Sequence, residues 1–308
     1  MSGPRICVVG ASNIDLISYV KRLPKMGETL HGTRFHMGFG GKGANQAVMA
    51  AKLDAQVSMI TKLGKDMFGE NTLKNFKSFG IDCSNVLFTD KAFSGVAPIT
   101  VDPDGNNAII IVTGANDLLS EEEINQARPV IASSRILICQ LEVPVEISLA
   151  ALKAAREENV KTILNPAPAS ADLPEEIYSA SDILCPNESE TEILTGMHIQ
   201  STDQAEKAAK QLLKKGTDTV ILTLGDRGSL LVTKEKALHI PTRKVKAVDS
   251  TGAGDAFVGS LAFFLASGKT LQKAVEYANY IAAVSVQASG TQTSFPDAAA
   301  LPSSMFSS

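Results

Sequence analysis

Short apolar segments rich in β-branched residues alternate with segments of helical periodicity along most of the chain. Continuous apolar runs of this length predict strands that are buried on both faces. Such runs occur at 6–9 (ICVV), 57–61 (VSMIT), 136–141 (ILICQL), 161–165 (KTILN), 182–186 (DILCP) and 219–224 (TVILTL). Between them, helical patterns occur at about 42–53, 67–79, 144–158, 188–195 and 203–215. The alternation predicts an α/β fold in which helices cover both faces of a mostly parallel sheet.

Two stretches break this alternation. Residues 14–37 carry Pro24, Gly27 and Gly32 between short apolar pieces and show no helical period. Residues 95–112 (GVAPITVDPDGNNAIIIV) predict a hairpin that turns at 103–105, because Asp-Gly supplies the positive φ that hairpin turns favour. We expect the two stretches to pair into a small β-sheet over one edge of the core. Two unrelated loops are the alternative.

Composition narrows the classes of protein that remain. The chain has 308 residues, of which 44% are hydrophobic and 20% charged, and a globular chain of this size buries about three quarters of its unfolded surface. No repeat, low-complexity tract or linker divides the sequence, so we expect a single domain over 1–308. The formal charge of −4 and the lack of any Lys/Arg cluster argue against a nucleic-acid partner.

The cellular setting follows from the same kind of observation. The N-terminus has no secretion signal, and no apolar run approaches the ~20 residues that span a bilayer. The cysteines Cys7, Cys83, Cys139 and Cys185 are far apart and the four histidines lack metal-ligand spacing. We expect a cytoplasmic protein with buried thiols, no membrane association and no structural zinc. A nuclear pool stays open.

The segment GFGGKGAN at 38–45 matches two nucleotide-binding patterns, and both fail on context. A dinucleotide fingerprint directly follows a strand, whereas the first predicted strand ends about 30 residues earlier, and the next strand is followed by Lys62 instead of an acid. A phosphate loop requires Ser or Thr after its lysine, but Gly43 follows Lys42. The glycines then predict a backbone that approaches a ligand closely.

Polar side chains gather around this glycine segment. Asn45 lies just inside the following helix, and Asn13 and Asp15 follow the first strand, at the sheet edge where open α/β folds bind ligands. Together with Lys42 they resemble a pocket for a polyol. Asn13 and Asp15 as simple turn formers are the alternative.

The segment DSTGAGDAF at 249–257 precedes an apolar helical pattern. Gly252, Ala253 and Gly254 place free N–H groups at a helix N-terminus, which favours an anion. A carboxylate beside such a site, here Asp255, can take the proton from a hydroxyl that attacks a phosphoryl group. Asp255 as a helix cap is the alternative.

Two further motifs contain candidate contacts for a magnesium ion and a nucleotide. In PNESETEIL at 186–194, Asn187 follows a strand, and Glu188, Glu190 and Glu192 are expected in the first turn of a helix. Helix N-termini favour acids, but three exceed that need, so Glu190 is a candidate to hold magnesium through water. TLGDRGSLL at 223–231 predicts a strand, a glycine turn and a strand, either a plain hairpin or a shelf for a nucleotide.

Taken together, the motifs resemble the PfkB carbohydrate kinase family, and within it the branch that phosphorylates ribose. The motifs occur in the family's order over essentially the whole chain: N-I-D at 13–15, GGKGANQA at 41–48, QLE at 140–142, NPAPA at 165–169, PNESE at 186–190, TLGDRG at 223–228 and DSTGAGDAF at 249–257. The resemblance implies a three-layer α/β/α core (ribokinase-like) with a small β-sheet lid from about 14–40 and 93–112. It also implies a homodimer formed through the lid.

The implied activity is ATP-dependent phosphorylation of the 5-hydroxyl of D-ribose, giving D-ribose 5-phosphate and ADP. Asp255 is the implied general base, and Gly252, Ala253 and Gly254 form the anion hole. The implied ribose contacts are Asn13, Ile14, Asp15, Gly41, Lys42, Gly43, Ala44, Asn45, Glu142 and Asp255. The implied ATP contacts are Asn187, Thr223, Leu224, Gly225, Asp226, Arg227, Gly228, Gly254 and Asn279, with Glu190 supporting Mg²⁺.

The family is also activated by a monovalent cation beside the anion hole. The matching positions for K⁺ are Asp249, Thr251, Ser285, Ala288, Gly290 and Ser294. Two positions depart from parts of the family pattern: Asn279 stands where some relatives present a histidine to adenine, and Thr251 replaces a bulkier aliphatic residue. Neither departure touches the chemistry.

Other functions compete with this one. A kinase for another sugar or a nucleoside shares every motif, and substrate profiling separates it. A non-catalytic sugar-binding regulator predicts loss of the base or of the anion hole, but Asp255, Gly252 and Gly254 are present. A nicotinamide-dependent dehydrogenase predicts the fingerprint that fails above.

Overall fold

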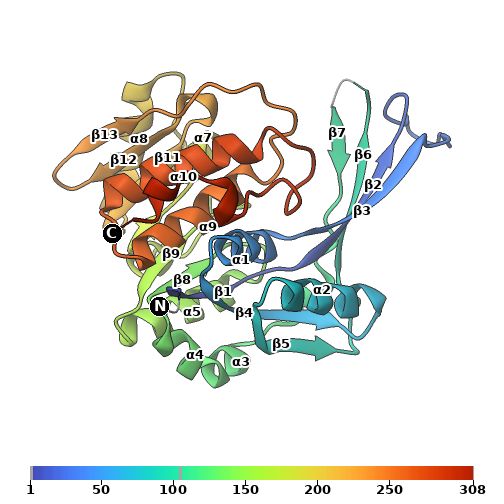
Figure 1. Ribbon diagram of the computed structural model, residues 1–308, viewed down its shortest axis with the longest axis horizontal. Coiled ribbons are helices and arrows are strands. Elements are labelled where there is room, and N and C mark those ends of the chain that lie inside the picture. The colour runs from blue at the N-terminus through green and yellow to red at the C-terminus, as the bar shows by residue number, and fades with distance from the viewer. Residues whose placement is uncertain (1–2, 104–105, 308) are drawn as a thin grey trace.

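The computed structural model describes residues 3–103 and 106–307. Within them, a nine-stranded sheet forms the centre of the molecule (Figure 1). Its strands are β1 (Arg5–Val9), β4 (Gln56–Gly64), β5 (Asp82–Thr89), β8 (Ile136–Cys139), β9 (Lys161–Leu164), β10 (Ile183–Leu184), β11 (Thr219–Thr223), β12 (Ser229–Thr233) and β13 (Ala237–Ile240). They lie in the order β13-β12-β11-β10-β9-β8-β1-β4-β5. Neighbours from β5 to β11 pair in parallel, and β12 and β13 add antiparallel pairs.

Helices cover both faces of this sheet, as the alternating pattern predicts. The helices are α1 (Lys42–Lys52), α2 (Met67–Ser78), α3 (Glu121–Gln126), α4 (Arg128–Ser133), α5 (Val145–Glu157), α6 (Glu176–Ser179), α7 (Glu188–Thr195), α8 (Thr202–Lys214), α9 (Ala253–Ala266) and α10 (Leu271–Ser285). Along β1, Ile6 and Val8 pack with α1, α2, α9 and α10, whereas Cys7 and Val9 pack with the helices of the other face. Since successive strand residues point to opposite faces, both layers bury apolar side chains and the strand is apolar throughout.

The structure confirms the predicted strands and helices to within a few residues at their ends. The pattern did not predict the strands β5 and β13, the helices α3, α4 and α6, or α10 near the C-terminus. For α3 a local signal exists, because Ser120 and Glu123 form a reciprocal capping box. No helix among the described residues has the length and the apolar character needed to cross a bilayer.

The two β excursions pair into one small sheet, which we call the lid sheet. It contains β2 (Asn13–Tyr19), β3 (Arg34–Gly40), β6 (Gly95–Val101) and β7 (Asn107–Ile109), in the order β3-β2-β6-β7. β6 and β7 pair antiparallel, so the predicted hairpin is present, although its turn at 104–105 lies outside the described residues. The lid sheet extends away from the core to the right of Figure 1.

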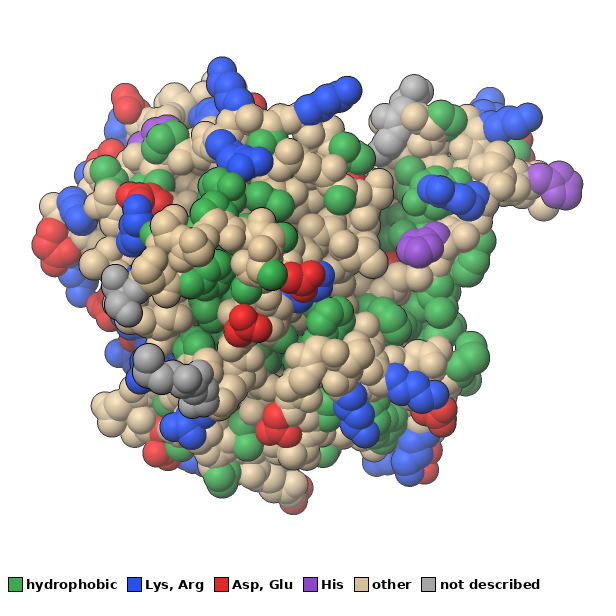
Figure 2. All heavy atoms as spheres, viewed as in Figure 1, with side chains coloured by type: hydrophobic (Ala, Val, Ile, Leu, Met, Phe, Trp, Pro, Cys, Tyr) green, Lys and Arg blue, Asp and Glu red, His purple; other side chains and the backbone are tan. Residues whose placement is uncertain are grey.

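One surface of the lid sheet is apolar. Phe35, Met37, Ile110 and Val112 are exposed and, by the strand register, point to this surface, whereas the exposed Ile109 and Ile111 point to the other face. Figure 2 shows apolar side chains gathered on the lid side of the molecule. Exposed apolar side chains that are contiguous indicate an interaction surface.

Candidate active site

The glycine segment brings the start of α1 against the end of β1. Gly41 has φ 87°, and a Cβ atom there would lie 2.7 Å from the carbonyl oxygen of Ala11. A Cβ atom on Gly43 would lie 2.7 Å from the carbonyl carbon of Gly10. The close approach for which these two glycines leave room is therefore to the chain's own backbone.

A distant carboxylate caps this helix. Glu142 Oε2 accepts a hydrogen bond of 2.8 Å from the backbone N–H of Lys42, one of the donors that a helix start leaves without a partner. Burial raises the pKa of Glu142, and the charge of Lys42 acts against that rise. Burial also opposes the charge on Lys42, but the carboxylates of Asp255, Glu142 and Glu190 outweigh it and raise the pKa of the lysine. The ammonium is thus held charged among three acids.

Asp255 lies in the first turn of α9, as predicted, and is buried. Its Oδ2 accepts from Asn45 Nδ2 and its Oδ1 from Gln46 Nε2, both at 2.9 Å. Burial raises the pKa of Asp255, whereas the charge of Lys42 and the two amide donors oppose that rise. Asn45 was among the predicted site residues. Gln46 was not, although it is the next residue of the GGKGANQA motif.

The polar residues that follow β1 do more than form a turn. Asn116, in the short 3-10 helix η1 (Gly114–Leu118), donates from Nδ2 to Asn13 Oδ1 at 2.9 Å and accepts from the backbone N–H of Ser12 at 2.9 Å. Because the Asn13 oxygen is engaged, its amide nitrogen is the end that can donate to a ligand. No local pattern points to Asn116, which is buried and 103 positions away from Asn13.

Asp15 is an acid of the site whose pKa is strongly raised. Burial raises its pKa to about 7, helped by the negative charges of Glu142 and Asp255. No hydrogen bond from a described residue counters this rise. A carboxylate without donors in a half-buried site is suited to accept hydrogen bonds from ligand hydroxyl groups.

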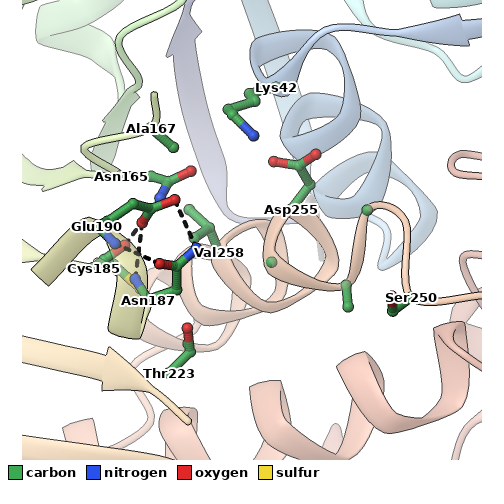
Figure 3. A pocket seen from close by; sticks show the side chains of 13 residues that line it. Lys42, Asn165, Ala167, Cys185, Asn187, Glu190, Thr223, Ser250, Asp255 and Val258 are labelled. Carbon is green, nitrogen blue, oxygen red and sulfur yellow. Dashed lines mark hydrogen bonds between the residues drawn. The ribbon is translucent and has the colours of Figure 1, made fainter. Parts of the chain in front are cut away.

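A cavity of about 170 Å³ lies between these elements. It is lined by Lys42, Asn165, Ala167, Cys185, Asn187, Glu190, Thr223, Ser250, Gly252, Ala253, Gly254, Asp255 and Val258. In Figure 3 the Lys42 amine and the Asp255 carboxylate point toward one another across one end of the cavity. Residues from the predicted sugar, anion and nucleotide motifs therefore line the same cavity.

The predicted anion hole is the N-terminal turn of α9. The N–H of Ala253 donates to the Ser250 carbonyl oxygen at 3.2 Å, so this donor is used by the turn itself. Gly254 and Asp255 follow in the first helical turn, where N–H groups have no partner within the helix. A Cβ atom on Gly254 would meet no atom within 4 Å, and Gly254 lines the cavity. The helix N-terminus thus opens onto the cavity.

Asn187 and Glu190 meet at another wall of the cavity (Figure 3). They form a capping box at the start of α7: Asn187 Oδ1 accepts from the N–H of Glu190, and Glu190 Oε2 accepts from the N–H of Asn187, both at 2.8 Å. Glu192 does not lie in the first turn, contrary to the prediction. It lies five positions into the helix and accepts the N–H of Ile199 at 2.6 Å.

The predicted glycine turn at 223–228 connects the antiparallel strands β11 and β12. Thr223 lines the cavity, and Arg227 forms an ion pair with Glu188 of α7, which fixes the turn beside the capping box. The other residues of the turn, Leu224, Gly225, Asp226 and Gly228, do not line the cavity. Asn279 of α10 is buried and donates from Nδ2 to Ser229 Oγ and to the Ile240 carbonyl oxygen, each at 3.0 Å.

The six positions matched to a monovalent cation lie on two segments that contact each other. Asp249 joins the segments, because Oδ1 accepts from the N–H of Thr251 at 2.9 Å and Oδ2 accepts from the N–H of Gly290 at 3.0 Å. The N–H of Val248 also donates to the Val286 carbonyl oxygen at 2.7 Å. The first segment runs directly into Gly252, so it adjoins the predicted anion hole.

The donor set of the cavity suits hard cations held mainly by other ligands. Among the described residues, no group of three or more His, Cys, Asp or Glu is arranged to hold a metal ion. Glu190, with its carboxylate, and Asn187, with its amide, do line the cavity. One carboxylate with water and phosphate oxygens is a common arrangement for magnesium.

Comparison with known proteins gives three consistent results. The model of the pfkB family carbohydrate kinases matches residues 4–298. The chain is 47% identical to a ribokinase from Mus musculus, covering 98% of this chain and 94% of that one, and 42% identical to a deoxyribokinase from Salmonella typhi, covering 94% and 95%. It also resembles the solved structure of Arabidopsis thaliana ribokinase complexed with ribose and ATP, with a TM-score of 0.89, 31% identity and 97% of both chains covered.

Proposed function

The chain belongs to the pfkB family of carbohydrate kinases, and from this premise we propose that it transfers the terminal phosphoryl group of ATP to the 5-hydroxyl of D-ribose. The products are D-ribose 5-phosphate and ADP. One observation carries the proposal: the buried Asp255 carboxylate adjoins the open N-terminus of α9 and faces Lys42 across a single cavity. This arrangement combines a base with a site for a phosphoryl anion.

In the reaction, Asp255 accepts the proton of the sugar hydroxyl. The hydroxyl oxygen forms a bond to the terminal phosphorus atom of ATP, and the bond from that phosphorus to the oxygen bridging to ADP breaks. Negative charge grows on the oxygens of the transferred group. The N–H groups of Gly252 and Gly254 and the positive end of the helix dipole stabilise that charge. Ala253, whose N–H is held by the Ser250 carbonyl oxygen, completes the turn that presents them.

Lys42 also stabilises the negative charge that grows on the transferred phosphoryl group. Its ammonium lines the cavity beside Asp255 and is kept protonated by three carboxylates. Glu142 holds the start of α1 through the N–H of Lys42, so the lysine projects from a fixed helix turn. Asp15, Asn13 and Asn45 bind the sugar hydroxyls, because each presents an amide or a carboxylate at the sugar end of the site.

Two metal ions complete the proposal. Glu190 holds Mg²⁺ through water, and the ion supplies charge neutralisation for the ATP phosphates. Asp249, Thr251, Ser285, Ala288, Gly290 and Ser294 hold K⁺. The carboxylate and carbonyl oxygens available on the two segments fit a hard cation.

We further propose that the chain acts as one kinase domain over 1–308 and associates as a homodimer through the lid, built from about 14–40 and 93–112. The exposed apolar surface of the lid sheet supports this association. We also propose nucleotide contacts from Asn187, Thr223–Gly228, Gly254 and Asn279, of which Asn187, Thr223 and Gly254 line the cavity.

A second acceptor, 2-deoxyribose, is favoured by the 42% identity to deoxyribokinase over 94% of this chain. An assay of ADP release with ATP and Mg²⁺ in potassium buffer separates the acceptors when it is run on D-ribose, 2-deoxyribose, fructose and adenosine. We expect D-ribose to give the highest kcat/KM. A higher value for another acceptor would reassign the sugar site while keeping the chemistry of Asp255. Sugar binding without turnover would support a regulator instead.

A further inference from the structure

Three buried amides from three different sequence motifs meet behind the base. Gln46 comes from GGKGANQA, Gln140 from QLE and Asn165 from NPAPA. All three are buried and all three belong to one hydrogen-bonded chain that ends on Asp255. We call this set the amide relay. The proposed sugar, nucleotide and metal contacts use none of its members.

Every polar atom of the Gln46 side chain is engaged. Its Nε2 donates to Asp255 Oδ1 at 2.9 Å and to Asn165 Oδ1 at 3.1 Å, which uses both of its hydrogens. Its Oε1 accepts from Gln140 Nε2 at 2.7 Å. A reversed Gln46 amide would place an oxygen against two acceptor oxygens. The orientation of this amide is therefore fixed.

The orientation of the Gln46 amide determines the orientation of the Gln140 amide. Because its nitrogen must face Gln46 Oε1, its own Oε1 points away and has no hydrogen-bond partner among the described residues. Gly10 leaves space for that oxygen, since a Cβ atom on Gly10 would lie 2.0 Å from it. A buried oxygen without a partner is unfavourable and requires an explanation. The amide relay explains this oxygen. If the Gln140 amide were reversed, its oxygen would lie against Gln46 Oε1, and Gln46 would lose the hydrogen bond from Gln140.

We propose that Gln46, held by Gln140 and Asn165, is a positioning residue for the base of the proposed kinase reaction. It fixes one carboxylate oxygen of Asp255 from behind, while Asn45 holds the other oxygen on the sugar side. The carboxylate cannot rotate away, so its remaining lone pairs stay directed at the acceptor hydroxyl. The inference rests on the proposed function, in which Asp255 takes the proton.

The relay also affects the charge of the base. Asp255 faces Lys42 from α1, Asp15 from β2, Glu142 after β8 and Glu190 from α7. Three of these four groups are acids, and burial already raises the pKa of Asp255. The donor on Gln46 opposes that rise. Removing the donor should make Asp255 bind its proton more tightly.

The variant Gln46→Met tests the inference, because methionine keeps the length of the side chain and removes both donors. We expect kcat to fall at least tenfold, KM for ribose to change less than threefold, and the acid limb of the kcat profile to move to higher pH. Gln140→Met acts one link farther away and should change the same quantities in the same direction, by a smaller factor. An unchanged acid limb with unchanged kcat in a folded Gln46→Met would overturn the inference.

Ser148→Ala is the matched control. Ser148 is buried and its Oγ donates to the backbone oxygen of Gln140 at 2.6 Å, so its loss weakens the same region without touching the relay amides. We expect a lower Tm with kcat and acid limb unchanged. If Ser148→Ala shifts both kinetic quantities as Gln46→Met does, the effect is structural and the inference fails.

A measurement without turnover separates this inference from the proposed function. The carboxyl carbon of Asp255 can be titrated by ¹³C NMR and identified by the loss of its signal in Asp255→Asn. A higher pKa in Gln46→Met, or in Gln140→Met if the first variant does not fold, supports the relay even if the wild-type protein phosphorylates no sugar. An equal pKa in the variants refutes it even if ribose is phosphorylated.

Discussion

Glu142 Oε2 accepts the backbone N–H of Lys42 at 2.8 Å, so a carboxylate that comes 100 residues later in the chain caps α1. The same helix presents Asn45 and Gln46 to Asp255, which is more than 200 residues away in sequence. The site is therefore assembled at the N-terminus of one helix from segments that meet only in the folded protein.

Gly254→Ala should separate activity from stability. A Cβ atom at this position meets no atom within 4 Å and projects where a phosphoryl group is proposed to lie. Alanine in a helical turn is about as stable as glycine or better, by up to ~1 kcal/mol. We expect kcat/KM for ATP to fall at least tenfold with Tm unchanged or raised. Thermal unfolding and initial rates measure the two effects.

Gly43→Ala serves as the contrast for that variant. Its Cβ atom would lie 2.7 Å from the carbonyl carbon of Gly10, so the backbone must shift. We expect a clear loss of Tm. Equal stability of the two variants would contradict the packing described for the start of α1.

Asp15→Asn should stabilise the protein above neutral pH while weakening sugar binding. The folded-state pKa of Asp15 is about 7 and its ordinary value is 3.8. Between these values the folded state holds a proton that the unfolded state has released, so the unfolding free energy falls as pH rises through that window. The full loss, at most about 4 kcal/mol at about 1.4 kcal/mol per pKa unit, is present above pH 7. We expect a larger gain in Tm at pH 8 than at pH 4.

The same residue sets the pH dependence of ribose affinity. Ionised Asp15 accepts hydrogen bonds from sugar hydroxyls, so the dissociation constant of the wild-type complex should rise as pH falls from 8 to 6. In Asp15→Asn it should be at least tenfold higher and independent of pH. Calorimetric titration at several pH values measures this, and a pH-independent wild-type affinity would exclude Asp15 as the acceptor.

Asp255→Asn should remove catalysis and spare binding. Loss of a general base commonly costs about 10²–10⁴ in rate, and here the base also borders the anion site. We expect kcat to fall about 10³-fold and the ribose dissociation constant to change less than threefold. A variant that keeps more than a tenth of wild-type turnover would show that another group takes the proton.

Potassium should be needed for full activity. Replacing KCl by NaCl at equal ionic strength should lower kcat, because the two segments joined by Asp249 lead directly into the anion site. Asp249→Ala should lower kcat in both salts and abolish the difference between them. If wild-type rates are equal in KCl, NaCl and choline chloride, the cation site does not exist.

The lid should carry the dimer contact. Ile110 is 66% exposed on the apolar surface of the lid sheet, so Ile110→Asp is expected to give a monomer of unchanged Tm. Ile193→Asp is the control, because Ile193 is 47% exposed on α7, away from the lid. Light scattering after size-exclusion chromatography measures the mass. A wild-type monomer at micromolar concentration would remove the proposal.

The sequence predicts those parts of this protein whose signal is local. Continuous apolar runs predict the buried strands, and the small residues before an apolar helix predict the turn that carries Asp255. The capping box of Asn187 and Glu190 is also local, although from the sequence only the acids of this segment were expected in the first helical turn. The edge strand β5 was not predicted, because its burial is mixed and hence shows no clear period.

Contacts between distant segments gave no such signal. Asn116, Gln140 and Asn165 are buried amides whose partners lie 94 to 119 positions away in the chain. The role of Gly41 and Gly43 could not be predicted either, because the backbone that they approach belongs to the loop after β1, which is distant in sequence. Glu192 was placed a turn too early, since three acids in one segment look alike before the helix start is known.

The layer formed by α1, α2, α9 and α10 has a consequence for how the protein is made. β1, β4 and α1 leave the ribosome early, whereas α9 and α10, which pack on the same face of the sheet, are translated last. Apolar side chains such as Ile6, Val8 and Met59 therefore lack the packing of α9 and α10 during most of synthesis. Such surfaces attract other chains while they are open. We expect nascent chains that stop before residue 253 to associate with a chaperone or aggregate, and full-length chains to be released on completion of the layer.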